Sequence, residues 1–205
     1  MILRLSNTQQ GFALALTSAV LWGVSGACAQ YVFQEKGVTI GWLVTVRLLI
    51  AGLILLGYAR WRGRDIWRIW QTRRSAVSLL IFGLLGMLAI QYTYFAAIQY
   101  SNAATGTVLQ YVGPVLIALY FVGVRRRWPT RAEAWAVLLA FLGTLLLVTH
   151  GDWGALQISA KALFWGLASA VALAFYSIQP ERLLKENEAT VLVGWGMLIG
   201  GLGFC

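Results

Sequence analysis

The feature that most constrains this chain is a series of seven long stretches in which charged side chains are almost absent. They cover residues 11–33, 38–59, 75–99, 103–124, 132–150, 160–180 and 189–205. A transmembrane helix needs roughly 20 apolar residues in succession. A helix also pairs its own backbone polar groups, as a lipid environment requires. The sequence therefore predicts an all-α fold, a polytopic transmembrane helical bundle with seven spans.

The composition agrees with a membrane protein. Only 11% of the 205 residues are charged and 60% are hydrophobic, whereas a soluble domain has about 25% charged residues. The residues between the stretches are too few and too dispersed to build a separate aqueous domain. We expect the function to lie in or across the bilayer.

The basic residues have an uneven distribution. The chain has sixteen Lys and Arg and seven Asp and Glu. All the basic residues except Lys36, Arg47 and Lys161 lie before the first stretch or in every second connection. Short loops rich in Lys and Arg stay in the cytoplasm. The excess thus indicates topology and no nucleic-acid partner, and it predicts an inner or plasma membrane protein with a cytoplasmic N-terminus.

Two connections give further predictions. The segment 60–74 mixes basic residues with Trp and Ile, a composition typical of a short amphipathic helix in the headgroup layer. Ser101 and Asn102 alone divide the third stretch from the fourth. Those two helices are therefore expected to be antiparallel neighbours.

The chain contains a short internal echo. The tripeptide Ser-Ala-Val at 18–20 recurs at 169–171, and Gly-Leu at 52–53 recurs at 201–202. A unit of five spans has odd parity, so a second copy enters the membrane from the opposite side, as in many secondary transporters. We expect a first five-helix repeat in residues 1–150 and the start of an inverted second repeat in residues 160–205.

Several residues resemble the EamA-type drug/metabolite transporter superfamily. They are Trp22 with Gly23, Arg47 with Ala51, and the run Gly83, Tyr94, Phe95, Ala97, Tyr100, Ser101 and Ala103 that leads through Leu109 to Pro114. The resemblance implies ten helices in two inverted five-helix halves. It also implies the movement of small metabolites, often amino acids or related compounds and often outward.

The chain departs from this family at two places. The Glu that commonly follows the fourth helix is replaced by Arg125, Arg126 and Arg127, and the chain stops in the seventh of ten expected helices. We expect a protein truncated after about seven helices. It is then either a fragment or a truncated gene product, or it works as a homo-oligomer or with a partner that supplies the missing helices.

The sequence offers little for catalysis. All seven carboxylates lie at the ends of stretches or in connections, and the single His150 has only Asp152 nearby. Cys28 and Cys205 have no metal-ligand spacing. We therefore expect no enzyme, no cofactor and no metal, and a transporter that is driven by gradients.

Arg47 is a charge inside a span, and such residues are costly in lipid and mark functional sites. We interpret it as a gating or carboxylate-binding residue, with snorkelling or pairing to a backbone carbonyl as the alternative. Pro114 lacks a backbone N–H and frees the carbonyl of Gln110, which predicts a kink in the fourth span. The kink is either a binding feature or a structural one.

Polar and aromatic side chains cluster in sequence around this kink and on neighbouring spans. The predicted substrate-binding residues are Trp22, Gln91, Tyr94, Gln110, Tyr111, Pro114 and Tyr176. An unpaired amide in hydrocarbon costs several kcal/mol, so the Gln side chains should face the interior, as substrate ligands or as hydrogen bonds between helices. Aromatic walls with a few amides suit a small solute with an apolar body and a polar head.

We thus predict a secondary transporter that exports small neutral or zwitterionic metabolites, such as amino acids, by alternating access. The alternative is a truncated membrane subunit or remnant without transport activity.

Overall fold

The computed structural model describes residues 7–126, 128–149 and 159–204, and every regular element in this part of the chain is a helix. Five continuous helical segments are long and apolar enough to cross a membrane: Gln9–Lys36, Ile40–Trp61, Arg73–Gln99, Ala103–Val124 and Ala160–Glu186. The predicted polytopic helical bundle is confirmed.

The segments divide into shorter elements at their irregular points. The elements are α1 (Asn7–Lys36), α2 (Ile40–Trp61), η1 (Arg68–Trp70), α3 (Arg73–Ile81), η2 (Phe82–Leu88), α4 (Ala89–Gln99), α5 (Ala103–Gln110), α6 (Val112–Arg125), α7 (Arg131–Thr149), α8 (Ala160–Ile178), α9 (Glu181–Glu186) and α10 (Ala189–Leu202). Helices α7 and α10 lie where the fifth and seventh spans are predicted. His150 and Cys205, which end those two spans, lie outside the described residues, and the crossing of the membrane by these two helices stays a prediction.

Side-chain caps fix where several helices begin. The hydroxyls of Thr39, Thr72 and Ser159 each accept a hydrogen bond from the first turn of α2, α3 and α8, and the Asn102 side chain does so for α5 at 2.7 Å from the Thr105 nitrogen. These caps satisfy backbone donors that the helix leaves free. Each of these helices therefore begins directly after its capping residue.

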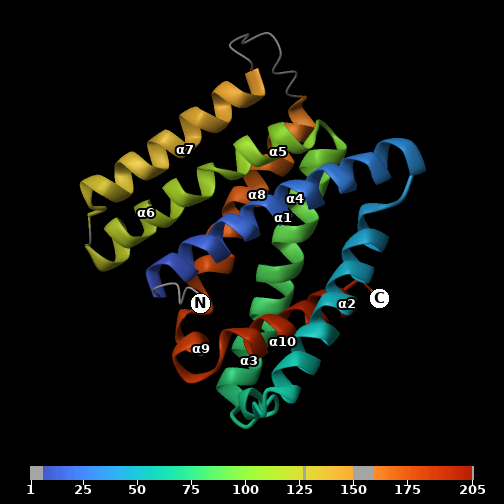
Figure 1. Cartoon of the computed structure of the whole chain (residues 1–205), viewed down its shortest axis with the longest axis vertical. Helices are drawn as coiled ribbons and strands as arrows, with labels where there is room; N and C mark the ends of the chain where they lie inside the picture. Colours follow the sequence, from blue (N-terminus) through green and yellow to red (C-terminus); the bar gives the residue numbers. More distant parts are fainter. Residues whose placement is uncertain (1–6, 127, 150–158, 205) are drawn as a thin grey trace, which may run out of the picture.

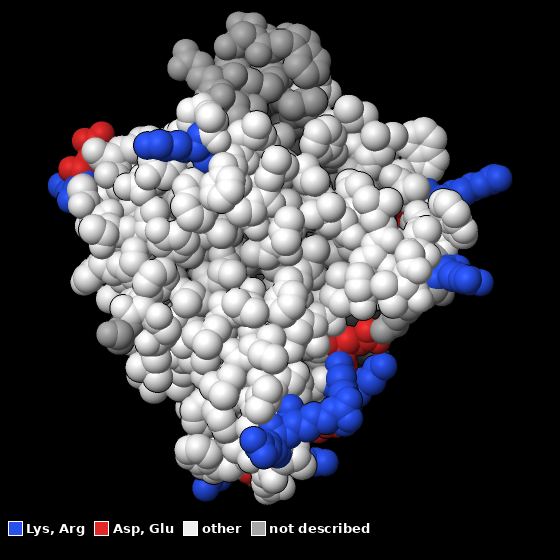
Figure 2. Space-filling model, turned by 180° about the vertical axis from the view of Figure 1, so that it is seen from behind, with Lys and Arg blue, Asp and Glu red and all other residues white. Residues whose placement is uncertain are grey.

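The basic connections lie on one side of the bundle. Figure 1 shows the connection between α2 and α3 at the bottom, α9 at the lower left and the turn between α6 and α7 at the left, while the turns after α1 and α4 lie toward the upper right. We call the side with the connection between α2 and α3, the turn between α6 and α7, and α9 the arginine-rich side. Figure 2 shows Lys and Arg at the lower end and along the right edge, a few more at the upper left, and a broad uncharged surface between them.

Helices α8 and α10 pack closely on helices that come earlier in the chain. Helix α8 packs on α4, α5 and α6, and α10 packs on α2. A Cβ atom added to Gly52 of α2 would lie 2.9 Å from the carbonyl oxygen of Gly194 in α10. Glycine is therefore required at this crossing, because the two backbones approach too closely for side chains.

The third span contains a feature that the sequence analysis missed, and the segment before it differs from the prediction. The middle of the third span, η2, is a π-helix.

In the connection 62–72, only the three residues of η1 are helical, so the predicted amphipathic helix is wrong. Gly63 has a left-handed φ of 74°, and Asp65 Oδ1 accepts hydrogen bonds from the Trp67 and Arg68 nitrogens. These turns replace the helix.

Candidate functional site

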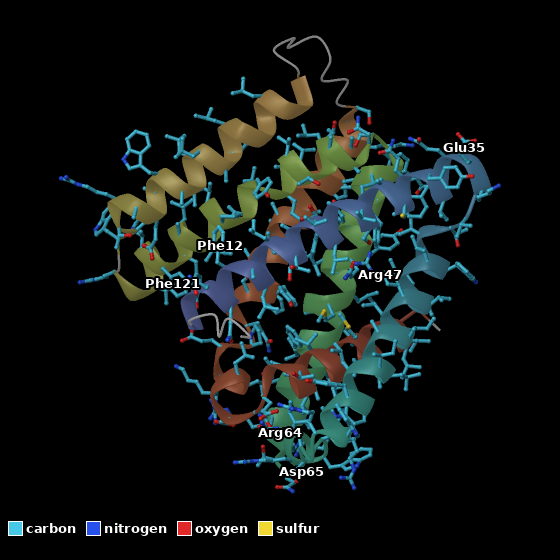
Figure 3. All side chains as sticks on the ribbon, in the orientation of Figure 1. Phe12, Glu35, Arg47, Arg64, Asp65 and Phe121 are labelled. Atoms are coloured by element: carbon cyan, nitrogen blue, oxygen red, sulfur yellow. The ribbon has the colours of Figure 1, made fainter. Side chains whose placement is uncertain are left out.

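Arg47 of α2 contacts α1 and α4. It lies seven residues after Ile40, about 10 Å along the axis, and its side chain is partly buried. Its Nη1 donates a hydrogen bond to Ser25 Oγ of α1 at 2.8 Å, and its guanidinium lies 5.2 Å from the centre of the Phe95 ring. Figure 3 shows Arg47 in the middle of the molecule. Among the described residues, no carboxylate forms an ion pair with it.

Tyr94 and Trp22 lie next to this group. Tyr94 of α4 is 4% exposed, and its hydroxyl lies 2.9 Å from Thr107 Oγ1 of α5. Thr107 already donates its own proton to the Ala103 carbonyl at 2.7 Å, so Tyr94 is the donor. The Trp22 ring of α1 lies 5.8 Å from the Tyr94 ring and is 41% exposed. Together these side chains form a polar and aromatic surface on α1, α2 and α4.

The fourth span is interrupted close to the position of the predicted kink. Helix α5 ends at Gln110, α6 begins at Val112, and Tyr111 between them donates its backbone N–H to the carbonyl oxygens of Thr107 and Val108. Gln110 is 6% exposed, and its Nε2 has no hydrogen-bond partner among the described residues. Such a buried donor is costly unless a ligand or water completes it. Tyr111 is 36% exposed.

The remaining predicted site residues divide between two parts of the core. Gln91 of α4 is 9% exposed and lies one turn before Tyr94. Tyr176 of α8 instead stacks on Phe82, with ring centres 5.4 Å apart, in a cluster with Leu183 and Leu192. The structure therefore places Tyr176 with residues of η2, α9 and α10, and not with Trp22 and Tyr94.

Sequence reasoning omitted several residues that complete the site. Ser25, Phe95 and Thr107 were not among the predicted site residues, although they are the partners of Arg47 and Tyr94. One signal was available for Ser25, because residues three apart on a helix share a face and Trp22 is three residues before it. No local pattern indicates Phe95 or Thr107, since both contacts join different helices.

A second feature lies on the arginine-rich side, where no site was predicted. A cavity of about 430 Å³ is lined by Gly63, Arg64, Asp65, Arg68, Lys185, Glu186, Asn187, Glu188 and Val191. Arg64 and Glu188 form an ion pair across it at 2.8 Å, and Trp195 Nε1 donates to the Ile66 carbonyl nearby at 2.8 Å. Figure 3 shows Arg64 and Asp65 at the lower end of the molecule. These contacts tie the connection 62–72 to α10.

Comparison with known proteins gives a consistent family. Residues 9–149 match the EamA-like transporter family. The chain is 44% identical over 198 residues to the uncharacterized inner membrane transporter YicL of Salmonella typhimurium, covering 97% of this chain and 66% of that protein. It is 26% identical over 196 residues to the threonine/homoserine exporter RhtA of the same species, covering 95% of this chain and 56% of RhtA.

Two other proteins extend the comparison. The pseudopaline exporter CntI of Pseudomonas aeruginosa is 27% identical over 134 residues, which are 64% of this chain and 45% of CntI. A solved crystal structure has the same fold, with a TM-score of 0.60 and 19% identity over 91% of this chain and 65% of that one. The chain spans about two thirds or less of the length of these proteins.

The family match extends over most of the chain and over the helices that carry Trp22, Arg47, Tyr94 and Gln110. The resemblance found in the sequence is thus confirmed. The chain belongs to the EamA-like transporter family and is a multi-pass membrane protein.

Proposed function

We propose that this chain forms the substrate-binding part of a gradient-driven exporter for small neutral or zwitterionic metabolites that carry a carboxylate, such as amino acids. The transport cycle is alternating access across the inner membrane. The observation that carries the proposal is Arg47, a cation within a membrane span whose described partners are a hydroxyl and an aromatic ring.

A carboxylate is the group that Arg47 is equipped to bind. Guanidinium offers five N–H donors in a planar fork that fits a carboxylate in a bidentate manner. Ser25 uses one of these donors and orients the group. Trp22 and Tyr94 supply an apolar wall beside it, which suits the body of a small amino acid.

The other proposed substrate ligands lie on α4 and at the break between α5 and α6. They are Gln91, Gln110, Tyr111 and Pro114. Tyr176 is not among them, because it stacks on Phe82 in another cluster. Gln110 supports the proposal most directly, because its buried Nε2 is a donor without a described partner. A polar group of the solute would complete this hydrogen bond.

The relatives support the substrate class and the location. One is named a threonine/homoserine exporter and another an inner membrane transporter. We place the arginine-rich side and the N-terminus in the cytoplasm, because basic loops are retained there. Labelling of single cysteines from outside intact cells tests this orientation. Reaction in the turn between α6 and α7, and not near Lys36, would reverse it.

Ligand binding tests the proposed function. We expect L-threonine and L-homoserine to raise the thermal midpoint of the purified chain, and L-threoninol, which lacks the carboxylate, not to do so. Arg47→Gln should weaken binding by about tenfold or more, since a charged hydrogen bond is lost. Arg131→Gln, at an exposed arginine, is the matched control.

An unchanged response in Arg47→Gln, or an equal response to threoninol, would reject the carboxylate site. Binding that persists in cells without any efflux of labelled threonine would favour the alternative, a membrane subunit without transport activity.

A further inference from the structure

The cavity of about 430 Å³ on the arginine-rich side is lined by charges of both signs. Its three cations and three carboxylates belong to Arg64, Arg68 and Lys185, and to Asp65, Glu186 and Glu188. Among the described residues that line it, none is aromatic. The lining therefore has balanced charge and offers sites for an anion and for a cation at the same time.

Two of these charged groups retain binding capacity. Arg68 is exposed, and no carboxylate of the described residues forms an ion pair with it, so its fork of N–H donors can bind an anion. Asp65 accepts the Trp67 and Arg68 nitrogens with Oδ1 alone, at 2.9 and 3.2 Å. Its Oδ2 accepts no hydrogen bond from the described part of the chain and can accept from a cation. An anion site and a cation site thus lie three residues apart in one connection.

The cavity lies at the end of the second membrane span. Helix α2 ends at Trp61 and the apolar helix α10 begins at Ala189, and the lining residues come from 63–68 and 185–191. Figure 3 shows Arg64 and Asp65 at the lower end of the molecule. Trp61 and Trp67 are 79% and 60% exposed, and exposed Trp is typical of the headgroup layer. The cavity therefore opens at the depth of lipid headgroups.

A smaller cavity adjoins the first and borders an aromatic surface. It measures about 160 Å³, shares Arg64 and Glu188 with the first cavity, and is also lined by Tyr58. The Tyr58 and Trp61 rings have centres 6.1 Å apart, and both side chains are exposed. Rings of this kind sit at membrane interfaces, where one end is apolar and the other is wet. This surface suits the glycerol and upper acyl groups of a lipid whose headgroup occupies the larger cavity.

We propose that the larger cavity binds the headgroup of a zwitterionic aminophospholipid, phosphatidylethanolamine, with its phosphate at Arg68 and its primary ammonium at Asp65. A phosphate accepts charged hydrogen bonds from a guanidinium, and an ammonium donates them to a carboxylate. The site concerns a lipid and does not depend on the transported solute.

The charges of the lining distinguish this lipid from two other classes. Phosphatidylglycerol would add a negative charge to a lining whose cations are already balanced by carboxylates. Phosphatidylcholine carries a quaternary ammonium, which has no N–H donor and which proteins bind in aromatic cages. The described lining contains no such ring. A headgroup with both a phosphate and a primary ammonium therefore fits best.

Binding of short-chain lipids tests the proposal. The purified full chain is titrated in one detergent with the dihexanoyl forms of phosphatidylethanolamine, phosphatidylglycerol and phosphatidylcholine, and thermophoresis of the labelled chain gives each Kd. We expect phosphatidylethanolamine to bind about fivefold more tightly than the other two, or better. Arg68→Gln should weaken its binding by about fivefold or more, because a charged hydrogen bond to the phosphate is lost. Arg73→Gln, at an exposed arginine that lines neither cavity, is the matched control and should bind the lipid normally.

Asp65→Asn tests the ammonium site separately. Asparagine keeps an oxygen that can accept the Trp67 and Arg68 nitrogens, so the turn is retained while the carboxylate charge is lost. We expect this variant to bind phosphatidylethanolamine and phosphatidylglycerol with equal affinity. A preference for phosphatidylethanolamine that persists in Asp65→Asn would overturn the assignment of the ammonium to Asp65.

The free headgroup, O-phosphoethanolamine, distinguishes a lipid from a soluble phosphate ester. It should bind about tenfold more weakly than the lipid, or worse, because it lacks the apolar groups that contact the aromatic surface. Equal affinity would reject a lipid and assign the cavity to a soluble ligand. Equal binding of the three lipids, or normal binding in Arg68→Gln, would overturn the proposal. So would a loss of L-threonine binding in Arg68→Gln with unchanged lipid binding, which would assign the cavity to the transported solute.

Retention of lipid from a bilayer is an independent measurement. The full chain is reconstituted into vesicles with equal amounts of phosphatidylethanolamine and phosphatidylglycerol, extracted in a mild detergent, and examined by native mass spectrometry. We expect phosphatidylethanolamine to be enriched on the unmodified chain and on Arg73→Gln, and this enrichment to be lost in Arg68→Gln. Equal retention of both lipids on the unmodified chain, or enrichment of phosphatidylglycerol, would reject the site.

Discussion

Helices α1 and α8 each carry a row of small side chains at four-residue spacing, yet the row in α1 is exposed and the row in α8 is buried. The rows are Gly11, Ala15, Ala19 and Gly23 in α1, and Ala162, Gly166, Ala170 and Ala174 in α8. Sequence pattern gives both helices the ability to pack closely, but α8 is buried against α4, α5 and α6 along this row, whereas the first half of α1 is exposed although α1 also contacts α4 and α5. Burial of such a row therefore depends on the neighbouring helices as well as on the helix that carries the row. The comparison also predicts that equal substitutions in the two helices have unequal effects.

The largest difference is expected between Gly166→Leu and Ala15→Leu. At Gly166 a side chain would collide with Leu109, and overpacking of this severity should lower the free energy of unfolding by about 3 kcal/mol or more. Ala15 is exposed, so its replacement should change little in the chain alone. Thermal unfolding in detergent, followed by size-exclusion chromatography, measures both. Similar losses in the two variants would break the comparison.

The next effect concerns the residue that fills the row on α8. Leu109 is 8% exposed, and Leu109→Ala should cost about 2–3 kcal/mol through lost contacts and a cavity. Leu16 of α1 is 54% exposed, and Leu16→Ala should cost less than about 0.5 kcal/mol. Unfolding by titration with sodium dodecyl sulfate gives the two values. A loss at Leu16 as large as at Leu109 would show that α1 is packed.

A smaller effect separates the two halves of α1. Ser25→Ala removes the hydroxyl that accepts from Arg47, which should cost about 1–2 kcal/mol because the donor is charged. Thr17 in the exposed half bonds only to the Ala13 carbonyl of its own helix among the described residues, so Thr17→Ala is the control with little expected change. Circular dichroism during heating compares the stability of the two variants. An unchanged stability in Ser25→Ala would show that Ser25 does not hold Arg47 in place.

The smallest effect is expected on the arginine-rich side. The Arg64 and Glu188 side chains are 52% and 45% exposed, and surface ion pairs contribute about 0–1 kcal/mol. Glu188→Gln should therefore lower stability by about 0.5 kcal/mol at most, with a smaller change still at high salt. Melting curves at two ionic strengths test this. A larger loss would mean that charges, and not close packing, hold α10 against the rest of the bundle.

The features that the sequence predicted correctly are local ones. Long stretches without charge imply membrane helices, and the fold class follows from their number and length. The break at Tyr111 follows from Pro114, since a missing N–H acts on the carbonyl one turn earlier. The two-residue connection at Ser101 and Asn102 made α4 and α5 antiparallel, and the contact between Tyr94 and Thr107 agrees with that arrangement.

The features that it missed depend on contacts between distant segments. Ser25 and Phe95 meet Arg47 only because three helices converge. The predicted helix in 60–74 is absent, since Trp195 holds the Ile66 carbonyl and its ring packs against those of Trp67 and Trp70. Tyr176 looked equivalent to the other aromatic candidates, but it stacks on Phe82 in another cluster. No period in the sequence encodes these neighbours.

The shared row on α1 and α8 bears on how a chain of this kind came to exist. If the two halves descend from one ancestral gene, substitutions can replace almost any side chain that faces lipid, but a residue in a tight backbone crossing has to stay small. The duplication then remains visible as small side chains at fixed intervals in the sequence. Common ancestry of the two halves can be sought in the positions that exclude large side chains, even after ordinary sequence similarity between the halves has faded.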